Sequence, residues 1–183
     1  ETPYGLAVGS SQGYGHIMSN GRTRIHNALA RLKQEGMNSA RVWLFMDLRN
    51  WESMTEIKGG KRVLKPQVYR DTDAIVKAQK ELGINVLPCL FEFHILNSIR
   101  VERGVPVGEH PEFFTAQGLK DFLTVLRPWI IRYARQFAYI DIMNEPENTA
   151  PEANTGIAFN PHIYNFLKGF ADEIHKNGGK VSV

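Results

Sequence analysis

The stretch that decides the fold is AYIDIMNEPE, residues 138–147. Its apolar part, Tyr139–Met143, has the length and composition of a buried strand, and Asn-Glu-Pro follows it directly at 144–146. A carboxylate at the end of a buried strand is costly unless chemistry or a partner justifies it. Because the residue before a proline is disfavoured in the helical region, we expect Glu145 to be held extended at the strand tip. The alternative is an ordinary strand-to-loop exit with a solvated glutamate.

Strands and helices alternate outward from this stretch. The predicted strands are short apolar runs at Tyr4–Val8, Ser39–Met46, Ile84–Phe93, Tyr139–Met143 and, beginning a fifth, Lys180–Val183. Helices are predicted between them over Arg22–Gln34, from a cap at Asp71 or Asp73 to Gly83, over Leu119–Gln136, and from Pro161 to Gly178. Strict alternation of this kind favours a parallel sheet.

The connections differ in length at the two ends of the predicted sheet. Helix-to-strand connections are tight, whereas the strand-to-helix connections Asp47–Arg70, His94–Gln117 and Glu145–Asn160 are long. An α/β barrel carries its site on the loops that follow the carboxyl ends of the strands. A doubly wound open sheet also carries its site there, so both architectures fit the loop lengths.

Composition narrows the class of protein. A chain of 183 residues with 43% hydrophobic and 22% charged residues is typical of one soluble globular domain. The net charge of +3 is dispersed, which gives no nucleic-acid stripe, and no run reaches the roughly 18 apolar residues of a membrane span. The single cysteine, Cys89, lies in an apolar run and is predicted to be a buried thiol, without disulfide or metal role. Glu1 is not a natural start, so the terminus is interpreted as a processed or engineered end, which leaves the compartment open.

The second strand carries a polar residue on one of its faces. Side chains alternate along a strand, which separates an apolar set from a set suited to a barrel interior, namely Arg41, Trp43, Phe45 and Asp47. A buried guanidinium needs a carboxylate, and Glu145 or an unidentified partner is the candidate. The alternative is an arginine at the exposed start of the strand.

Polar residues also gather at the ends of the third and fourth strands. Glu92 and His94 share a face of the third strand, where His94 could bind a substrate hydroxyl or orient a carboxylate, or could be purely structural. Strict alternation cannot send both Asn144 and Glu145 inward, so a bulge or a twist is required if both serve a site.

Tryptophans are candidates for stacking on the apolar faces of sugars. Trp43 is predicted to face the interior near the functional end, and Trp51 lies in a long loop at that end. Trp129 lies in a predicted helix and is expected in the core.

These motifs resemble a known clan of enzymes. The segments Ala40-Arg41-Val42-Trp43-Leu44-Phe45 and Asp141-Ile-Met-Asn144-Glu145-Pro146 are similar to those of retaining (β/α)8 glycoside hydrolases of the cellulase and β-mannanase family. The Arg-x-Trp pattern followed by Asn-Glu-Pro looks most like the β-mannanase-type members. The resemblance implies a TIM barrel of which this chain is the N-terminal part, about strands 1–5. It also favours a secreted or extracytoplasmic enzyme without a cofactor.

The resemblance also implies roles for individual residues. Glu145 would be the general acid/base, Asn144 would hold the sugar 2-hydroxyl and the nucleophile, Arg41 would brace the nucleophile, and His94 would line the glycone subsite. Glu92, Trp43 and Trp51 complete the expected sugar-binding set. An acid with a pKa raised by burial would suit this cycle.

One member of the expected machinery is missing from the sequence. The clan's nucleophile is a glutamate that ends strand seven, so we expect it from the remainder of the barrel, in the same or another chain. A full barrel takes ~250 residues. One alternative is a non-catalytic carbohydrate-binding or half-barrel module that needs a partner chain. Another is a metal-dependent barrel enzyme, with ligands from Glu92, His94, Asp141 and Glu145.

Overall fold

The computed structural model describes residues 25–46, 48, 51–95, 100–102, 105–107, 112, 115–146 and 161–182. The strand predicted at Tyr4–Val8 lies outside these residues, as does Asp47. None of the described helices is long and apolar enough to span a bilayer.

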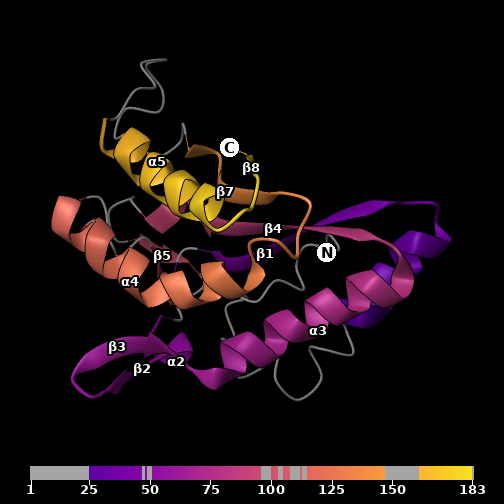
Figure 1. Cartoon of the computed structure of the whole chain (residues 1–183), viewed down its shortest axis with the longest axis horizontal. Helices are drawn as coiled ribbons and strands as arrows, with labels where there is room; N and C mark the ends of the chain where they lie inside the picture. Colours follow the sequence, from indigo (N-terminus) through magenta and orange to yellow (C-terminus); the bar gives the residue numbers. More distant parts are fainter. Residues whose placement is uncertain are drawn as a thin grey trace.

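A parallel sheet organises the structure. Its four strands are β1 (Ser39–Met46), β4 (Asn85–Glu92), β7 (Ile140–Asn144) and β8 (Val181–Ser182), in that order across the sheet, and all three pairings are parallel (Figure 1). The strands fall where the apolar runs predict them, within one or two residues at each end. The predicted parallel sheet with alternating helices is therefore confirmed.

Helices connect the strands. One covers residues 25–34, followed by α2 (Trp51–Met54), α3 (Pro66–Leu82), α4 (Ala116–Tyr133) and α5 (Pro161–Lys176). The predicted cap of α3 at Asp71 or Asp73 is wrong, because Pro66 occupies the first turn and starts the helix five residues before Asp71. Its predicted end is right: Gly83 adopts the left-handed conformation, φ 59°, that closes a helix.

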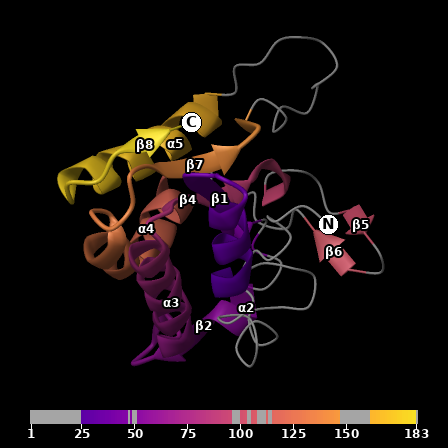
Figure 2. The ribbon, with the colours of Figure 1, turned by 90° about the vertical axis from the view of Figure 1, so that its right-hand side faces the viewer.

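The hydrophobic core lies between the sheet and the helices. Phe91 of β4 is fully buried and contacts Phe122 of α4, together with Phe166 and Phe170 of α5, at ring-centroid distances of 5.3, 5.6 and 5.0 Å. The ribbon views show α3, α4 and α5 gathered on one side of the strands (Figures 1 and 2). The opposite face of the sheet is therefore left for polar side chains.

A bulge changes the face of one predicted residue. The pairing of β1 with β4 shifts between Trp43 and Met46. As a result Phe45, predicted to face the barrel interior, is 1% exposed and packs in the core against Trp129, with ring centroids 5.7 Å apart. Arg41 and Trp43, which precede the shift, are only partly buried.

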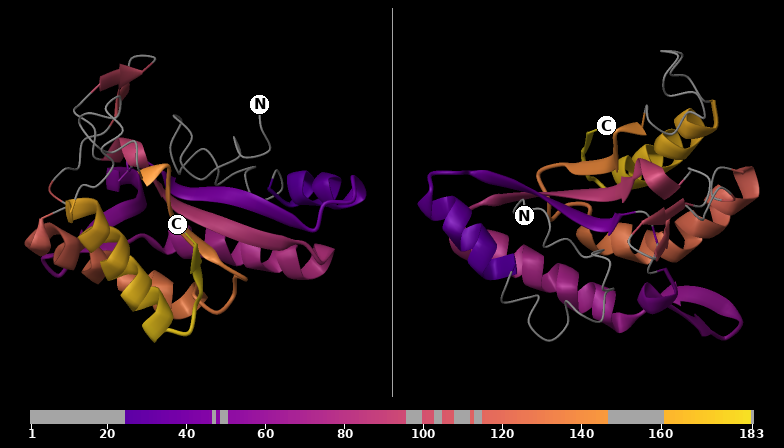
Figure 3. Two further views of the ribbon diagram at one scale, coloured as in Figure 1. Left: turned by 90° about the horizontal axis from the view of Figure 1, so that it is seen from above. Right: turned by 180° about the vertical axis from the view of Figure 1, so that it is seen from behind.

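Both long loops at the carboxyl ends of β1 and β4 contain a hairpin. The first pairs β2 (Thr55–Lys58) with β3 (Lys61–Leu64) through Gly59 and Gly60, whose positive φ values suit a tight hairpin turn. The second follows the short helix η2 (Phe93–Ile95) and pairs β5 (Arg100–Glu102) with β6 (Val105–Val107). Figure 3 shows both hairpins beyond the strand ends, where loops alone were predicted.

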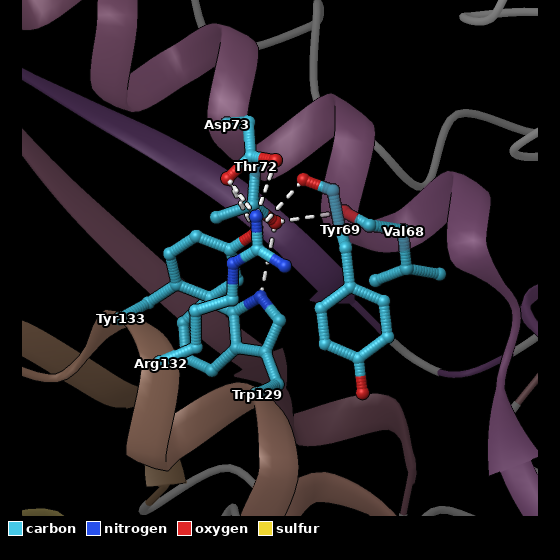
Figure 4. A network of polar contacts seen from close by, with 7 residues as sticks. All are labelled: Val68, Tyr69, Thr72, Asp73, Trp129, Arg132 and Tyr133. Atoms are coloured by element: carbon cyan, nitrogen blue, oxygen red, sulfur yellow. Dashed lines mark hydrogen bonds and ion pairs between the residues drawn. The ribbon is translucent and has the colours of Figure 1, made fainter.

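A polar network joins α3 to α4 on the side of the sheet that the helices cover (Figure 4). Trp129 Nε1 donates to Thr72 Oγ1 at 3.0 Å, and Thr72 Oγ1 donates to the Val68 carbonyl at 2.9 Å. Arg132 binds both oxygens of Asp73, at 2.9 and 2.7 Å. Burial and the hydrogen bond to Asp73 raise the pKa of Tyr133, so its hydroxyl stays protonated as a donor.

Thr72→Val tests the buried part of this network. Valine keeps the shape of threonine but removes the acceptor for Trp129, and a buried unsatisfied N–H costs about 1–3 kcal/mol. We expect urea unfolding to show a loss of stability of that size. Thr124→Val is the matched control, because Thr124 also donates to the carbonyl four residues earlier, at 2.8 Å, but is exposed. Equal losses in both variants would contradict a role for the buried contact.

Candidate active site

Arg41 is the centre of the polar face of the sheet. Its Nε donates to Asp141 Oδ2 at 2.7 Å, and its Nη2 donates to the same oxygen. Nη1 donates to Asn144 Oδ1 at 2.8 Å. The carboxylate predicted for Arg41 exists, but it is Asp141 rather than Glu145, because the parallel register aligns Asp141 with Cys89 beside Arg41.

The contact with Arg41 fixes the orientation of the Asn144 amide. An arginine has donors only, so the atom of Asn144 that meets it must be the carbonyl oxygen. The NH2 group of Asn144 is thereby directed away from the guanidinium, and it has no hydrogen-bond partner among the described residues. Asn144 is partly exposed, so this NH2 group can donate to a bound molecule.

Cys89 lies beneath the guanidinium as a neutral thiol. Its sulfur accepts from Arg41 Nη2 at 3.1 Å, and the thiol donates to the Phe91 carbonyl at 3.4 Å. Burial raises the pKa of Cys89, the nearby Asp141 carboxylate raises it further, and Arg41 partly opposes both. The predicted buried thiol is confirmed, since Cys89 is 0% exposed.

Two predicted sugar-binding residues border this cluster. Glu92 pairs with Asn144 across β4 and β7, and its side chain is 6% exposed. The Trp43 ring lies 5.5 Å from Arg41 Cζ, an arrangement that holds the indole beside the guanidinium. Trp43 therefore lies against the cluster of Arg41, Cys89, Asp141 and Asn144, called here the Arg41 cluster, and Glu92 lies beside Asn144 of this cluster.

Glu145 ends β7 in an unusual backbone conformation. Its φ is +51°, so the expected extended conformation is wrong, although the side chain is exposed. In the described part of the chain, Leu48 is the one other non-glycine residue with positive φ, and it follows the carboxyl end of β1. Such conformations cost about 1–3 kcal/mol and concentrate at functional sites. The left-handed turn also breaks the regular alternation of the strand at Glu145, directly after Asn144.

Trp51 and His94 are the two remaining residues of the predicted sugar-binding set. Trp51 is 5% exposed and packs edge-on against Phe122 at 5.2 Å, so almost none of its ring is available to a sugar. His94 belongs to η2 directly after β4, and its side chain lies outside the described part of the structure. Among the side chains that are described, no three His, Cys, Asp or Glu residues gather closely enough to bind a metal ion.

Comparison with solved structures decides the architecture. The whole chain superposes on β-mannanase from the blue mussel Mytilus edulis with TM-score 0.68 and 18% identity, and on β-1,4-mannanase from the sea hare Aplysia kurodai with TM-score 0.66 and 20% identity over 98% of the chain. Endo-1,4-β-mannanase from Eisenia fetida gives TM-score 0.64 and 18% identity over 94%. The chain has the fold of part of a (β/α)8 barrel, which it shares with these enzymes.

The chain matches only part of each of these enzymes. The chain covers 55%, 55% and 53% of the mussel, sea hare and Eisenia enzymes, so it spans about half of their length. No protein-family model and no curated protein sequence matches it. In this partial barrel, the Arg41 cluster lies on the sheet face opposite the helices and extends along β7 from Asp141 to Asn144 at the carboxyl end of the strand.

Sequence reasoning missed the role of Asp141. Its signal was present, since it is the only charged residue within the apolar run Tyr139–Met143. Its partner depends on strand register, which a sequence pattern does not provide.

Glu145→Gly and Glu145→Ala together test the backbone strain. Glycine adopts positive φ without the Cβ penalty, which is about 1–2 kcal/mol for other residues. We expect thermal and urea unfolding to show the glycine variant more stable than the alanine variant by about 1 kcal/mol. An alanine variant equal to or more stable than the glycine variant would contradict the left-handed conformation.

Proposed function

We propose that the protein is a retaining glycoside hydrolase acting on β-linked polysaccharide or oligosaccharide of the β-mannan or β-glucan type. The observation that supports it most is the placement of Asn144 and Glu145 at the carboxyl end of β7, with Asn144 bound to Arg41. Barrel enzymes carry their catalytic groups at this end of the strands. The similar folds of three β-mannanases favour β-mannan as the substrate.

Glu145 is the general acid/base in this proposal. It protonates the leaving oxygen in the first step and, once ionised, activates the water that hydrolyses the glycosyl-enzyme in the second. Its exposed side chain leaves it accessible to substrate. The nucleophile is a second carboxylate, roughly 5–5.5 Å from the first in retaining enzymes. It comes from the remainder of the barrel, in the same or another chain.

The other polar residues bind and orient the sugar. The NH2 group of Asn144 donates to the oxygen of the 2-hydroxyl and orients this group, whose hydrogen bonds strengthen in the transition state. Arg41 braces the nucleophile, Trp43 offers part of its ring to a sugar face, and Glu92 and His94 line the glycone subsite. Trp51 takes no part in sugar binding here because its ring is enclosed in the core.

Glu145→Ala in the completed barrel tests the acid/base assignment. Oligosaccharides have poor leaving groups and need the proton, so their kcat/KM should fall by about 10²–10⁴-fold. The leaving group of a dinitrophenyl β-mannoside needs no proton, so this substrate should release a burst of dinitrophenolate and then turn over slowly. Added azide should restore turnover, because this anion attacks the glycosyl-enzyme without a general base.

Glu35→Ala is the matched control. Glu35 is also an exposed glutamate, but it lies before β1, at the opposite end of the sheet from Glu145. Removal of the Glu35 carboxylate should change the hydrolysis rate of neither substrate. Equal losses on oligosaccharide and dinitrophenyl substrates in Glu145→Ala would contradict the assignment. A wild-type protein that binds manno-oligosaccharides without cleaving them would instead identify the carbohydrate-binding module.

A further inference from the structure

Asp141 binds one edge of the Arg41 guanidinium, and the Nη1 group remains for contacts at the candidate site. The Nε–Nη2 edge of the guanidinium binds Asp141 Oδ2, and the second Nη2 proton meets Cys89. Nη1 is thereby turned toward Asn144. Four of the five N–H groups have partners, and the fifth, on Nη1, has none among the described residues.

We propose that Asp141 is a positioning residue, which acts through Arg41 to hold the Asn144 amide with its NH2 group available to an oxygen of the bound sugar. Asp141 does this by removing the rotational freedom of the guanidinium. A guanidinium bound by a single contact can turn about its side-chain bonds, whereas one bound along an edge has its plane and direction fixed. Fixing Nη1 then fixes the Asn144 carbonyl oxygen and, with it, the opposite NH2 group.

Cys89 alone could not provide this orientation. Its thiol is neutral and a weak acceptor, whereas an ionised carboxylate forms hydrogen bonds roughly twice as strong as neutral ones. Asp141 also balances the charge of Arg41. The side chains are 32% and 13% exposed for Arg41 and Asp141, so an unbalanced charge would be costly here. It would also oppose the positive charge that develops on the sugar during glycoside cleavage.

This inference rests on the proposed function only for the identity of the ligand. The orientation of Asn144 can be measured without any sugar, from the ¹⁵N–¹H resonances of its side-chain amide in the full-length protein. Asn144→Asp, which removes these resonances, assigns them. Sugar binding is measured separately by calorimetry, with a manno-oligosaccharide and with a matched oligosaccharide that lacks the 2-hydroxyl at the site.

Asp141→Ala is the decisive variant. We expect it to shift the Asn144 amide resonances and to weaken binding of the normal oligosaccharide roughly tenfold, the effect of one lost oriented hydrogen bond. Binding of the 2-deoxy oligosaccharide should change little. Asp141→Asn, which keeps an acceptor oxygen without the charge, should restore part of the effect and replaces the alanine variant if that does not fold.

Asp73→Ala is the matched control. Asp73 also binds an arginine, Arg132, but in the network between α3 and α4, so its loss should leave Asn144 and both ligands unaffected. Unchanged Asn144 resonances in Asp141→Ala would overturn the proposal, as would equal weakening of both oligosaccharides. If the resonances shift but the wild-type protein binds neither oligosaccharide, the positioning role stands and the proposed function fails.

Discussion

The contact of Arg41 with Asp141 connects the packing of the sheet to the chemistry of its polar face. Arg41 lies on β1 and Asp141 on β7, and β4 runs between them. The Arg41 side chain therefore extends across β4 to reach Asp141, and its guanidinium also contacts Cys89 of β4. A contact of this reach holds only if all three strands keep their register, so the register of the sheet and the orientation of Asn144 depend on each other.

The two faces of the sheet differ in composition and exposure. The face toward the helices buries Val42, Leu44 and Ile142, and aromatic rings from α4 and α5 enclose Phe91. The other face carries Arg41, Trp43 and Asp141, which are partly exposed. In a (β/α)8 barrel the first face meets the outer ring of helices and the second points to the barrel interior. The arrangement explains how an ordinary hydrophobic core can support a polar cluster at the strand ends.

Much of the fold could be predicted from the sequence because it depends on local patterns. The apolar runs predict β1, β4 and β7, and Pro161 predicts the start of α5. The features that were missed depend on tertiary context. The bulge that sends Phe45 into the core, the hairpins inside the long loops and the enclosure of Trp51 by Phe122 have no local signature.

The candidate site shows the same division. Strand position predicted Glu92 at the carboxyl end of the sheet, where it pairs with Asn144, and the resemblance implied that Arg41 and Asn144 serve one site, where they form a hydrogen bond. The sequence left the partner of Arg41 open between Glu145 and an unidentified carboxylate, because the true partner, Asp141, reaches it only through the alignment of β4 with β7. The backbone of Glu145 was also misjudged. The proline that follows favours extended geometry, but the strand-end turn imposes a left-handed one.

In the proposed function, this site cleaves β-linked sugars by double displacement. Proton NMR of fresh products tests it most directly, with the completed barrel acting on a β-1,4-manno-oligosaccharide. We expect the β-anomer of the new reducing end to form first and the α-anomer to follow only by mutarotation. An α-anomer formed first would mean single displacement by water and would contradict the account.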